Sequence, residues 1–560
     1  MDNYQIADSF SLLAKLMDIH SENSFKAKSY AAAAFNIEKL PMQLSEMPLD
    51  KLSGIKGIGE STGKKVAELL TTGELKALTE MIEKTPPGVM EMLNIKGIGP
   101  KKIATIWKEM EIETIGELLY ACKENRLKLY KGFGEKTQQN VIETIEFYLK
   151  SKGCFLFSQI ETMHNNIKSF IAKLFSENKF AFTGAYKRQL ETVNEIEIVI
   201  DDTIKNIGHT LTTAEDFELL ETNETDLLYR ASVGLKFRLY GCDSKPIIQL
   251  AFTKGCSEEF ERNFTQQFPG IDYLACANEE DIFKKAGLHF IPACQRETTA
   301  VIERAKTAPL PSLLMVNDIK GIIHSHSNWS DGGSTIEDMA MNAIEKGFEY
   351  LVISDHSKSA FYANGLEVER IMAQHIYIDE LNIKLAPFKI FKSIESDILN
   401  DGSLDYSSNI LATFDLIIAS VHSNLKMSEE KAMLRLMNAI ENPYTTILGH
   451  MTGRLLLSRK GYPVDHKRII DACAANHVVI ELNAHPNRLD IDWRHMDYAL
   501  KKNVLISIDP DAHSPEGFGD IKYGVSVAQK AMLTKERNLS SFSLAELKEY
   551  LLNRKRLKNI

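Results

Sequence analysis

The chain has 560 residues, of which 44% are hydrophobic and 25% are charged, with a formal net charge of −10. This composition is typical of folded globular domains and excludes a disordered or fibrous protein, and the length is too great for one hydrophobic core. The acidic balance argues against a chain coated in positive potential, although local basic patches can still bind nucleic acid. We therefore expect roughly three to five domains.

The seven cysteines are scattered, odd in number and form no C-x-x-C pair, which indicates neither a disulfide framework nor a zinc knuckle. The first ten residues, MDNYQIADSF, contain no basic segment followed by an apolar run, and the sequence contains no long uninterrupted apolar stretch. These features predict a soluble, cytoplasmic protein with reduced thiols and no membrane association.

The N-terminal part, from residue 3 to about residue 149, has apolar residues at helical spacing, interrupted by short glycine-containing turns. Three turns are similar, GIKGIG (54–59), NIKGIG (94–99) and YKGFG (130–134), and lysines follow each of them. Glycines let the backbone approach a phosphate closely, and helix N-termini offer N–H donors. One such turn is often only a connector, whereas three favour binding to a phosphate backbone.

These turns resemble the helix-hairpin-helix motif, which binds the DNA backbone without reading the base sequence. The resemblance implies a small helical domain over residues 1–80 and a fingers-like helix-hairpin-helix domain over residues 81–150. The partner that it implies is DNA, bound independently of sequence. The residues that it places at DNA are Gly57, Gly59, Lys96, Gly97, Gly99, Lys101, Gly132 and Gly134.

The first turn and the helix after it, residues 57–78, resemble the small N-terminal domain of family X DNA polymerases. The family's Schiff-base lysine, which removes 5′-deoxyribose phosphate, corresponds to Lys65. Such a lysine needs its pKa lowered by a neighbouring cation, and Lys64 is the candidate. Simple phosphate contact by Lys65 is the alternative, and it is the one that we favour.

From residue 151 to about residue 255 the sequence changes to strand-like runs with short helices. The segment FTGAYKRQLETVNEIEIVIDD (182–202) resembles the palm motif of the same polymerase family, in which a Gly-Ser turn binds triphosphate and an Asp-x-Asp strand holds two Mg²⁺ ions. The resemblance implies a nucleotidyltransferase-like palm over residues 151–255 and a thumb over residues 256–308. Residues 309–319, with two prolines, are predicted to form a linker.

The palm motif has lost its metal-binding aspartates. Glu195 and Glu197 replace two of them, and alignment puts Lys236 on the third. Two-metal phosphoryl transfer needs carboxylates at fixed positions, the extra methylene of glutamate displaces them, and a lysine repels Mg²⁺ and can pair with either glutamate. We therefore expect weak Mg²⁺ binding and little polymerase activity. The degenerate polymerase site comprises Ala185, Arg188, Glu195, Glu197 and Lys236.

The stretch GIIHSHSNWSDG (321–332) contains a His-x-His pair, His324 and His326, followed by Asp331 at a Gly-Gly turn. On a β-strand, residues i and i+2 point the same way, so both histidines are expected to converge on one metal ion while Asp331 reaches in from a loop. Alone, the pattern equally fits two polar residues at the end of a strand.

Similar strand-like runs recur downstream, and each of them ends in a polar residue. A β/α barrel places its chemistry at the C-terminal ends of its strands. Each residue alone fits a surface or satisfied core position, but their recurrence predicts a polynuclear metal site. The predicted metal ligands are His324, His326, Asp331, His356, Glu395, His422, His450, Asp511 and His513.

The HxH, SDG, DH, SVH, GHxTGR and DAH motifs of residues 320–560 resemble those of the PHP (polymerase and histidinol phosphatase) family. A family X core followed by a PHP domain is the arrangement of bacterial family X DNA polymerases with 3′–5′ exonuclease activity. The resemblance implies a multidomain α+β and α/β protein whose last domain is a distorted PHP-type β/α barrel. One departure is Ile322, where the family has an aspartate that we expect to orient ligands.

Nine nitrogen and oxygen ligands predict about three Mn²⁺ or Zn²⁺ ions, which would activate water and stabilise the leaving 3′ oxygen. Glu395 is the expected bridging carboxylate. Arg454 and Arg459 are expected to contact substrate phosphate, although solvated surface charge explains them equally well.

We therefore expect a DNA-repair phosphodiesterase that trims 3′ ends or cuts at abasic sites in gapped or nicked DNA, while the polymerase core mainly binds DNA. Two alternatives stay open, namely an active gap-filling polymerase with a proofreading PHP domain, and a DNA-end-binding scaffold without catalysis. A small-molecule phosphatase fits a lone PHP domain, but the three hairpins disfavour it.

Overall fold

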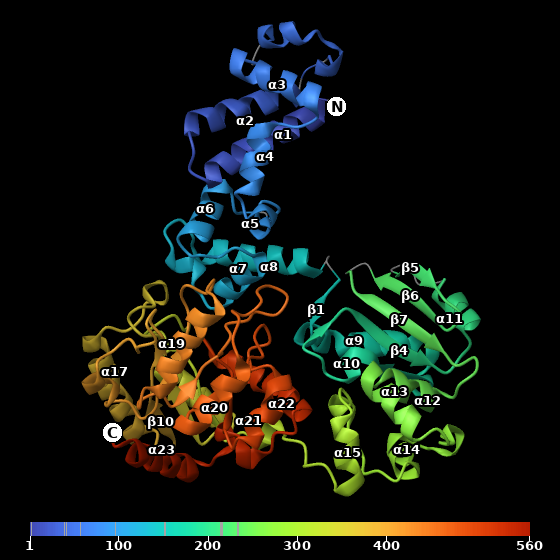
Figure 1. Ribbon diagram of the computed structural model, residues 1–560, viewed down its shortest axis with the longest axis vertical. Helices are drawn as coiled ribbons and strands as arrows, with labels where there is room; N and C mark the ends of the chain where they lie inside the picture. The colour runs from blue at the N-terminus through green and yellow to red at the C-terminus, as the bar shows by residue number, and fades with distance from the viewer. Residues whose placement is uncertain are drawn as a thin grey trace. The chain divides into compact units, whose positions relative to one another are not determined.

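The chain forms two compact units, Met1–Glu146 and Phe147–Ile560. In the part that the structure covers, none of the helices combines the length and apolar character that crossing a membrane requires. The structure, a computed structural model, describes residues 1, 3–38, 40, 42–55, 58–95, 97–150, 153–212, 217–231 and 234–560 (Figure 1).

The first unit consists of helices joined by tight turns. The rings of Phe10 and Tyr30, 5.8 Å apart, pack the first two helices together. A capping box starts α7, because Thr114 Oγ1 accepts the N–H of Glu117 and Glu117 accepts the N–H of Thr114. The helices are α1 (Asn3–Ile19), α2 (Ser24–Glu38), α3 (Glu60–Thr72), α4 (Lys76–Glu83), α5 (Pro87–Met92), α6 (Pro100–Lys108), α7 (Ile115–Lys123) and α8 (Glu135–Lys150).

The second unit begins with a mixed sheet of strand order β2-β4-β7-β6-β5, drawn in green in Figure 1. Along β4, Ile196, Ile198 and Ile200 enter the core, so Glu195 and Glu197 lie on the other face. The strands are β1 (Phe155–Leu156), β2 (Phe180–Thr183), β3 (Thr192–Val193), β4 (Glu195–Ile200), β5 (Phe217–Thr222), β6 (Asp226–Ala231) and β7 (Lys236–Gly241), with helices α9 (Phe157–Phe175), α10 (Gly184–Lys187), α11 (Ile204–Leu211) and α12 (Ile247–Lys254).

A small helical subdomain follows, made of α13 (Glu258–Gln267), α14 (Glu279–Lys285) and α15 (Ala300–Thr307). Its core contains the fully buried Arg296, whose guanidinium lies 5.2 Å from the Phe252 ring centre and 5.0 Å from that of Phe283. Glu279 pairs with this guanidinium at 2.7 Å, so the buried charge is both neutralised and stacked on aromatic faces.

The last domain is a barrel of parallel strands. Two sheets, of order β10-β9-β8 and β11-β12-β13-β14-β15, are joined by single bridges between Ser325 and Ala512 and between His356 and Glu395. The strands are β8 (Gly321–Ile322), β9 (Tyr350–Ile353), β10 (Lys389–Lys392), β11 (Glu395–Asp397), β12 (Ile418–Ser420), β13 (Ile447–Leu448), β14 (Val479–Asn483) and β15 (Ile506–Asp509).

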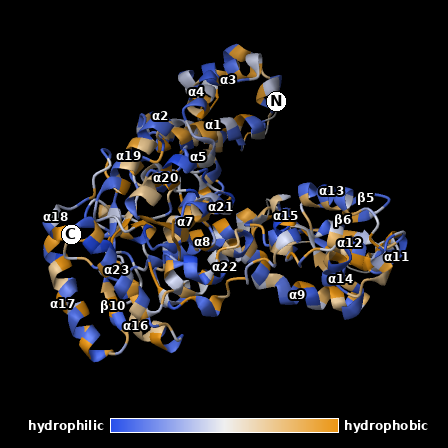
Figure 2. Ribbon diagram, turned by 60° about the horizontal axis from the view of Figure 1, so that its bottom comes forward, coloured by the Kyte–Doolittle hydropathy of each residue, from blue (hydrophilic) through white to orange (hydrophobic). Residues whose placement is uncertain are grey.

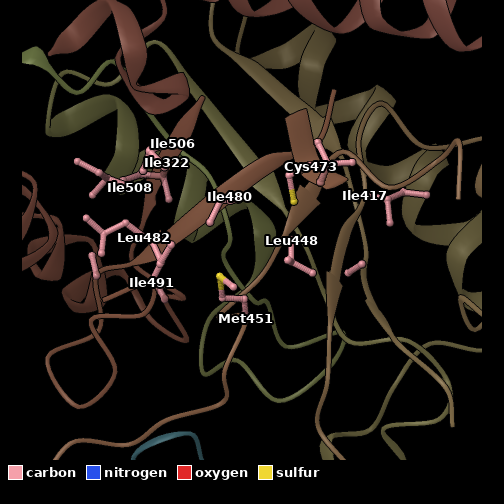
Figure 3. Close-up of a cluster of buried hydrophobic side chains, with 14 of the residues drawn as sticks. Ile322, Ile417, Leu448, Met451, Cys473, Ile480, Leu482, Ile491, Ile506 and Ile508 are labelled. Carbon is pink, nitrogen blue, oxygen red and sulfur yellow. The ribbon is translucent and has the colours of Figure 1, made fainter. Parts of the chain in front are cut away.

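Helices surround these strands; hydrophilic and hydrophobic residues are mixed along their ribbons (Figure 2), and their buried apolar residues pack on the barrel. Inside this layer, Ile322, Leu448, Ile480 and Ile508 of the strands pack with Cys473 of α20 (Figure 3). Ile322 is therefore a core residue. The helices are α16 (Ile336–Glu345), α17 (Val368–Lys384), α18 (Ser408–Leu411), α19 (Glu429–Glu441), α20 (His466–Asn476), α21 (Trp493–Lys501), α22 (Ile521–Lys530) and α23 (Leu544–Lys558).

His375 on α17 is predicted to make the barrel sensitive to acid. Burial lowers the pKa of His375 to about 4, Lys392 acts in the same direction, and the ring packs edge-on against Phe414 at 5.0 Å. Because the folded pKa lies below the unfolded value near 6.5, the stabilising contribution is complete above pH 6.5 and is lost as the pH falls towards 4, by up to about 3 kcal/mol.

The measurement is urea unfolding of the wild type and of His375→Gln between pH 7 and pH 4. As the pH falls, we expect the free energy of unfolding of the wild type to decrease relative to that of His375→Gln, because glutamine cannot be protonated in this range. A gap that stays constant with pH would contradict a depressed histidine pKa.

Candidate metal centre

The His-x-His segment is not a regular strand. β8 ends at Ile322, and His324 adopts a left-handed backbone conformation (φ 61°), so the expectation of a continuous strand through both histidines is wrong. The segment is held instead by Ala512, whose oxygen accepts the N–H of His326 at 2.8 Å and whose N–H donates to His324 at 3.2 Å. Asp511 is also left-handed (φ 52°), and the His324 and His326 ring centres lie 5.2 Å apart.

Glu395, the first residue of β11, lies at the centre of the predicted ligands. Its Oε1 is 3.0 Å from Nε2 of His422 and 2.9 Å from Nε2 of His450. Its Oε2 is 3.0 Å from Nδ1 of His356 and 3.7 Å from Nε2 of His326. A carboxylate in this position has both oxygens available to join neighbouring cations.

Two aspartates complete the cluster from the loops after β8 and β15. Asp511 Oδ1 lies 3.1 Å from His326 Nε2, and Asp331 Oδ1 lies 3.4 Å from His513 Nε2. The structure thus brings all nine predicted ligands into one region at the C-terminal ends of the strands. Donor atoms lie within 4.8 Å of one another in the sets His326, Asp331, His356 and His513; His324, His326 and Asp511; and His356, Glu395 and His422.

Outer carboxylates orient two of the histidines. Nδ1 of His324 lies 2.5 Å from Oε1 of Glu481, and Nδ1 of His422 lies 2.5 Å from Oδ1 of Asp397. A carboxylate that holds the Nδ1 proton leaves the Nε2 lone pair facing the cluster, which is the arrangement of many histidine metal ligands. Glu481 therefore positions His324 even though Ile322 replaces the aspartate of the resembling family.

These outer carboxylates were not among the residues predicted from the sequence. Glu481 lies in β14, and Asp397 lies two residues after Glu395. Both could have been predicted as residues that orient the ligands, because they are acidic residues within the strand-like segments that contain or precede the predicted ligands. Arg488 was missed as well. It is buried, and its Nε lies 3.8 Å from Oδ2 of Asp511, which also accepts a 3.1 Å hydrogen bond from Asn483.

The electrostatics of the cluster suit a cation. Burial lowers the pKa of His326 to about 3 and, with Arg488, lowers the pKa of His450 to about 3, so both rings are neutral at pH 7 and able to ligate. Burial opposes ionisation of Glu395, but His422 and the other facing histidines hold its pKa well below the ordinary value. Burial opposes protonation of His324, His356 and His422, but the facing carboxylates raise their pKa values, so a bound cation would replace the protons of these rings.

Several donor atoms of the cluster are not satisfied by the protein. Nδ1 of His326, both ring nitrogens of His356 and Oε2 of Glu395 are buried and make no hydrogen bond of normal geometry to the described part of the chain. Each such atom costs roughly 1–3 kcal/mol. Imidazole and carboxylate donors are those that Zn²⁺ and Mn²⁺ accept, so these residues fit a bound metal cluster.

The two arginines predicted to contact phosphate are engaged by other groups of the protein. Arg454 pairs with Asp492 at 2.5 Å, and Arg459 donates to the carbonyl oxygen of Gly453 at 3.0 and 2.8 Å. A phosphate would have to compete with these contacts, so their role as a clamp stays a prediction.

The altered palm residues pair with one another. Glu195 accepts two hydrogen bonds from Arg238, at 2.6 and 3.1 Å, and Arg238 also contacts Asp226 at 2.6 Å. Although the register sets Lys236 opposite Glu195, the partner is Arg238 and not the predicted Lys236, because its longer side chain forms a bidentate pair.

The turn that the resemblance assigns to triphosphate is also occupied. Glu197 accepts hydrogen bonds from the Tyr240 hydroxyl at 2.8 Å and from the N–H of Ala185 at 3.3 Å. Arg188, one of the two basic residues of the motif, pairs with Glu297 at 3.0 Å. Protein groups thus take the places that metal and phosphate would need.

The described hairpin glycines face open space. Gly97 (φ 96°) and Gly132 (φ 92°) are left-handed, and a Cβ added at either would meet nothing within 4 Å. Gly59, Gly99 and Gly134 directly precede α3, α6 and α8, and Lys101 is exposed. This geometry leaves room for a phosphate at each helix start. Gly57 and Lys96 lie outside the described residues.

Lys65 lies in α3, and its predicted lyase role stays a prediction. The neighbouring cation invoked for it, Lys64, forms an exposed 2.8 Å ion pair with Glu60. This pair offsets the charge that would lower the pKa of a Schiff-base lysine.

Comparison with known families agrees with this organisation. Residues 1–75 match the family model "Helix-hairpin-helix domain", residues 89–146 match "SAM-like Helix-hairpin-helix tandem", and residues 323–485 match "PHP domain". The predicted fold class, a helix-hairpin-helix region followed by mixed sheets and a PHP-type barrel, is thereby confirmed.

The chain is 30% identical to the "DNA polymerase/3'-5' exonuclease PolX" of Bacillus subtilis (strain 168), over 96% of this chain and 97% of that protein. Shorter relatives cover 42% of this chain. They include a "Probable phosphatase" of Thermoanaerobacter sp. (strain X514), 26% identical over 97% of its length, and one of Caldanaerobacter subterraneus subsp. tengcongensis, 27% identical over 91% of its length.

Proposed function

Because the chain belongs to the family of the DNA polymerase/3'-5' exonuclease PolX of Bacillus subtilis, we propose that its PHP domain removes nucleotides from the 3′ ends of DNA by metal-dependent phosphodiester hydrolysis. The observation that carries the proposal is the buried set of histidines and carboxylates around Glu395, several of whose donor atoms receive no hydrogen bond from the described residues. Such a site favours hydrolytic chemistry over a purely binding role.

The nine predicted ligands would hold the metal ions, and bound Mn²⁺ or Zn²⁺ supplies the Lewis acidity that activates water and polarises a phosphodiester. The protein supplies orientation. Glu481 and Asp397 hold the Nδ1 atoms of His324 and His422, so that the Nε2 atoms point inward. Arg488, beside Asp511, places a fixed positive charge at the edge of the cluster, where a phosphate charge would be stabilised.

The helix-hairpin-helix turns are proposed to hold the DNA backbone, which suits gapped or nicked substrates with little sequence preference. The palm is proposed to bind DNA with impaired nucleotidyl transfer. The ion pair between Glu195 and Arg238 and the contacts of Glu197 support this, because both carboxylates would have to be released before Mg²⁺ could bind.

A 5′-labelled primer-template, incubated with full-length protein and Mn²⁺ with and without dNTPs, tests these assignments. We expect the primer to shorten, and we expect His324→Ala/His326→Ala to abolish shortening. An internal abasic site in a second substrate tests endonuclease cleavage.

The same double variant, given dNTPs, reports polymerase activity without competing degradation. Robust primer extension would overturn the proposal of an impaired palm. DNA binding with neither shortening nor extension in any divalent metal would favour a scaffold. Activity on p-nitrophenyl phosphate but none on DNA would favour a small-molecule phosphatase.

A further inference from the structure

A loop beside the metal centre presents an exposed aromatic ring. It starts two residues after the ligand His356 and contains a short 3-10 turn, Phe361–Ala363. The Phe361 side chain is 78% exposed. Isolated exposed apolar residues are common, so exposure alone carries no function.

Hydrogen bonds near both ends of this loop fix the backbone that carries the exposed Phe361 ring. The N–H and the hydroxyl of Ser359 donate to the two carboxylate oxygens of Asp405, each at 2.6 Å. Leu366 donates its N–H to the carbonyl of His356 at 2.9 Å, which closes the base of the loop at the metal ligand. An apolar ring on a rigid support is pre-organised for a partner.

The loop is also tied to the segment that carries Asp331. Asn364 adopts a left-handed conformation (φ 55°), and its Nδ2 donates to the carbonyl of Trp329 at 3.1 Å, two residues before Asp331. The exposed ring therefore belongs to a loop connected to two predicted ligands, one at each side.

A second loop repeats the pattern after the ligand His450. Leu455 and Arg459 exchange two backbone hydrogen bonds of 2.8 Å, which forces Leu457 at the tip into a left-handed conformation (φ 60°) with 46% of its side chain exposed. A branched residue in this region stores roughly 1–3 kcal/mol of strain. Both loops leave the C-terminal ends of parallel strands, the end at which the metal ligands lie.

Each loop also carries an exposed lysine, Lys358 on the first and Lys460 on the second. Lys358 lies three residues before Phe361, and its Nζ lies 5.6 Å from the centre of the Tyr406 ring. Lys460 lies three residues after Leu457, so each loop combines a positive charge with an exposed apolar residue in a chain of net charge −10. A nucleotide offers the matching pair, a flat base for the ring and a phosphate for the ammonium.

We propose that Phe361 stacks on one of the last two bases at the 3′ end of single-stranded DNA while Lys358 contacts the adjoining phosphate. Leu457 packs against the same strand end. Phe361 is thus a specificity residue, which favours a nucleic-acid end over a small phosphate ester. This inference rests on the proposed hydrolysis of DNA ends by the PHP site.

The test uses full-length Phe361→Ala with two oligonucleotides, one normal and one whose last two nucleotides lack bases. For normal DNA we expect kcat/KM to fall by about tenfold or more, because base stacking on an aromatic ring has about this effect. For the baseless end we expect no difference between the variant and the wild type. Phe361→Tyr keeps the ring and should keep the activity.

Ile383→Ala is the matched control. Ile383 lies near the C-terminal end of α17, the helix that follows the loop, and it is 82% exposed. It should behave as wild type on both substrates. An equal loss on both oligonucleotides in Phe361→Ala, or no loss on either, would overturn the stacking role.

A binding measurement separates this inference from the proposed function. 2-Aminopurine at the 3′ end of the DNA loses fluorescence when it stacks, and Ca²⁺ in place of Mn²⁺ limits hydrolysis. We expect quenching by the wild type and by Ile383→Ala, and recovery of fluorescence in Phe361→Ala. If the wild type quenches the 2-aminopurine fluorescence but never hydrolyses DNA, the proposed function is refuted and the stacking is supported. If the wild type and Phe361→Ala quench the fluorescence equally, the stacking is refuted.

Discussion

Replacing Glu395 by glutamine is expected to lower Mn²⁺-dependent DNA hydrolysis by at least about a thousandfold. Glu395 is the carboxylate that reaches three of the histidines within 3.0 Å, namely His356, His422 and His450. A glutamine keeps the shape but removes the charge and one of the two carboxylate oxygens that would hold metal, so the site would bind its ions more weakly. Steady-state hydrolysis of a 3′-end substrate and metal content by mass spectrometry measure the effect.

Thermal unfolding gives a second readout of the same change. Metal that binds only the folded state raises the melting temperature, so a chelator should lower it in the wild type. The shift should be much smaller in Glu395→Gln. Glu369→Gln, an exposed position on α17, is the matched control and should keep both activity and the chelator response. Full activity or full metal content in Glu395→Gln would remove Glu395 from the proposed centre.

Replacing Lys530 by methionine is expected to destabilise the second unit by about 3 kcal/mol. Lys530 ends α22 of the barrel, its side chain is fully buried, and its Nζ donates to the carbonyl of Arg188 at 2.8 Å and to Glu297 at 3.1 Å. It also reaches the carbonyl of Cys294 at 3.3 Å. Methionine fills a similar volume but removes this donor from the two carbonyl oxygens and the second cation from Glu297, which keeps its pair with Arg188.

Because Arg188 lies in the predicted palm and Glu297 lies between α14 and α15 of the helical subdomain, Lys530 couples these parts to the barrel. We expect calorimetry to show the palm with the thumb melting separately from the barrel in Lys530→Met. Lys522→Met is the matched control. It lies on the same helix and pairs with Glu161 at 2.7 Å, but its side chain is 46% exposed, so its loss should cost less than about 1 kcal/mol. Equal effects of both substitutions would show that burial of Lys530 adds nothing.

Local sequence pattern was enough to select the histidines and carboxylates that converge at the candidate metal centre. His356, His450 and Asp511 each follow a short apolar run, and parallel strands bring their C-terminal ends to one edge of a barrel. The helix-hairpin-helix turns could be predicted as well, because glycine adopts left-handed backbone conformations without steric cost, as Gly97 and Gly132 do. Periodicity and backbone geometry act over a few residues, so a sequence displays them directly.

Pairing between distant side chains was not readable in this way. The sequence suggested Lys236 as partner of Glu195, but Arg238 takes that place, and Glu481 orients His324 from 157 positions away. Hydrogen-bond partners depend on side-chain length and direction within about 3 Å, which only the packed structure defines.

The same distinction between local sequence and tertiary contacts applies to the backbone at His324 and His326. The residue types of His324 and His326 pointed to a metal, whereas the left-handed turn at His324 and its bridge to the segment around Ala512 depend on contacts across the barrel. The sequence by itself determined which side chains are available as metal ligands in the barrel, because histidine and carboxylate residues are identified by residue type alone. Only the tertiary structure decided which groups hold those ligands in place, because that positioning comes from strands far apart in the chain.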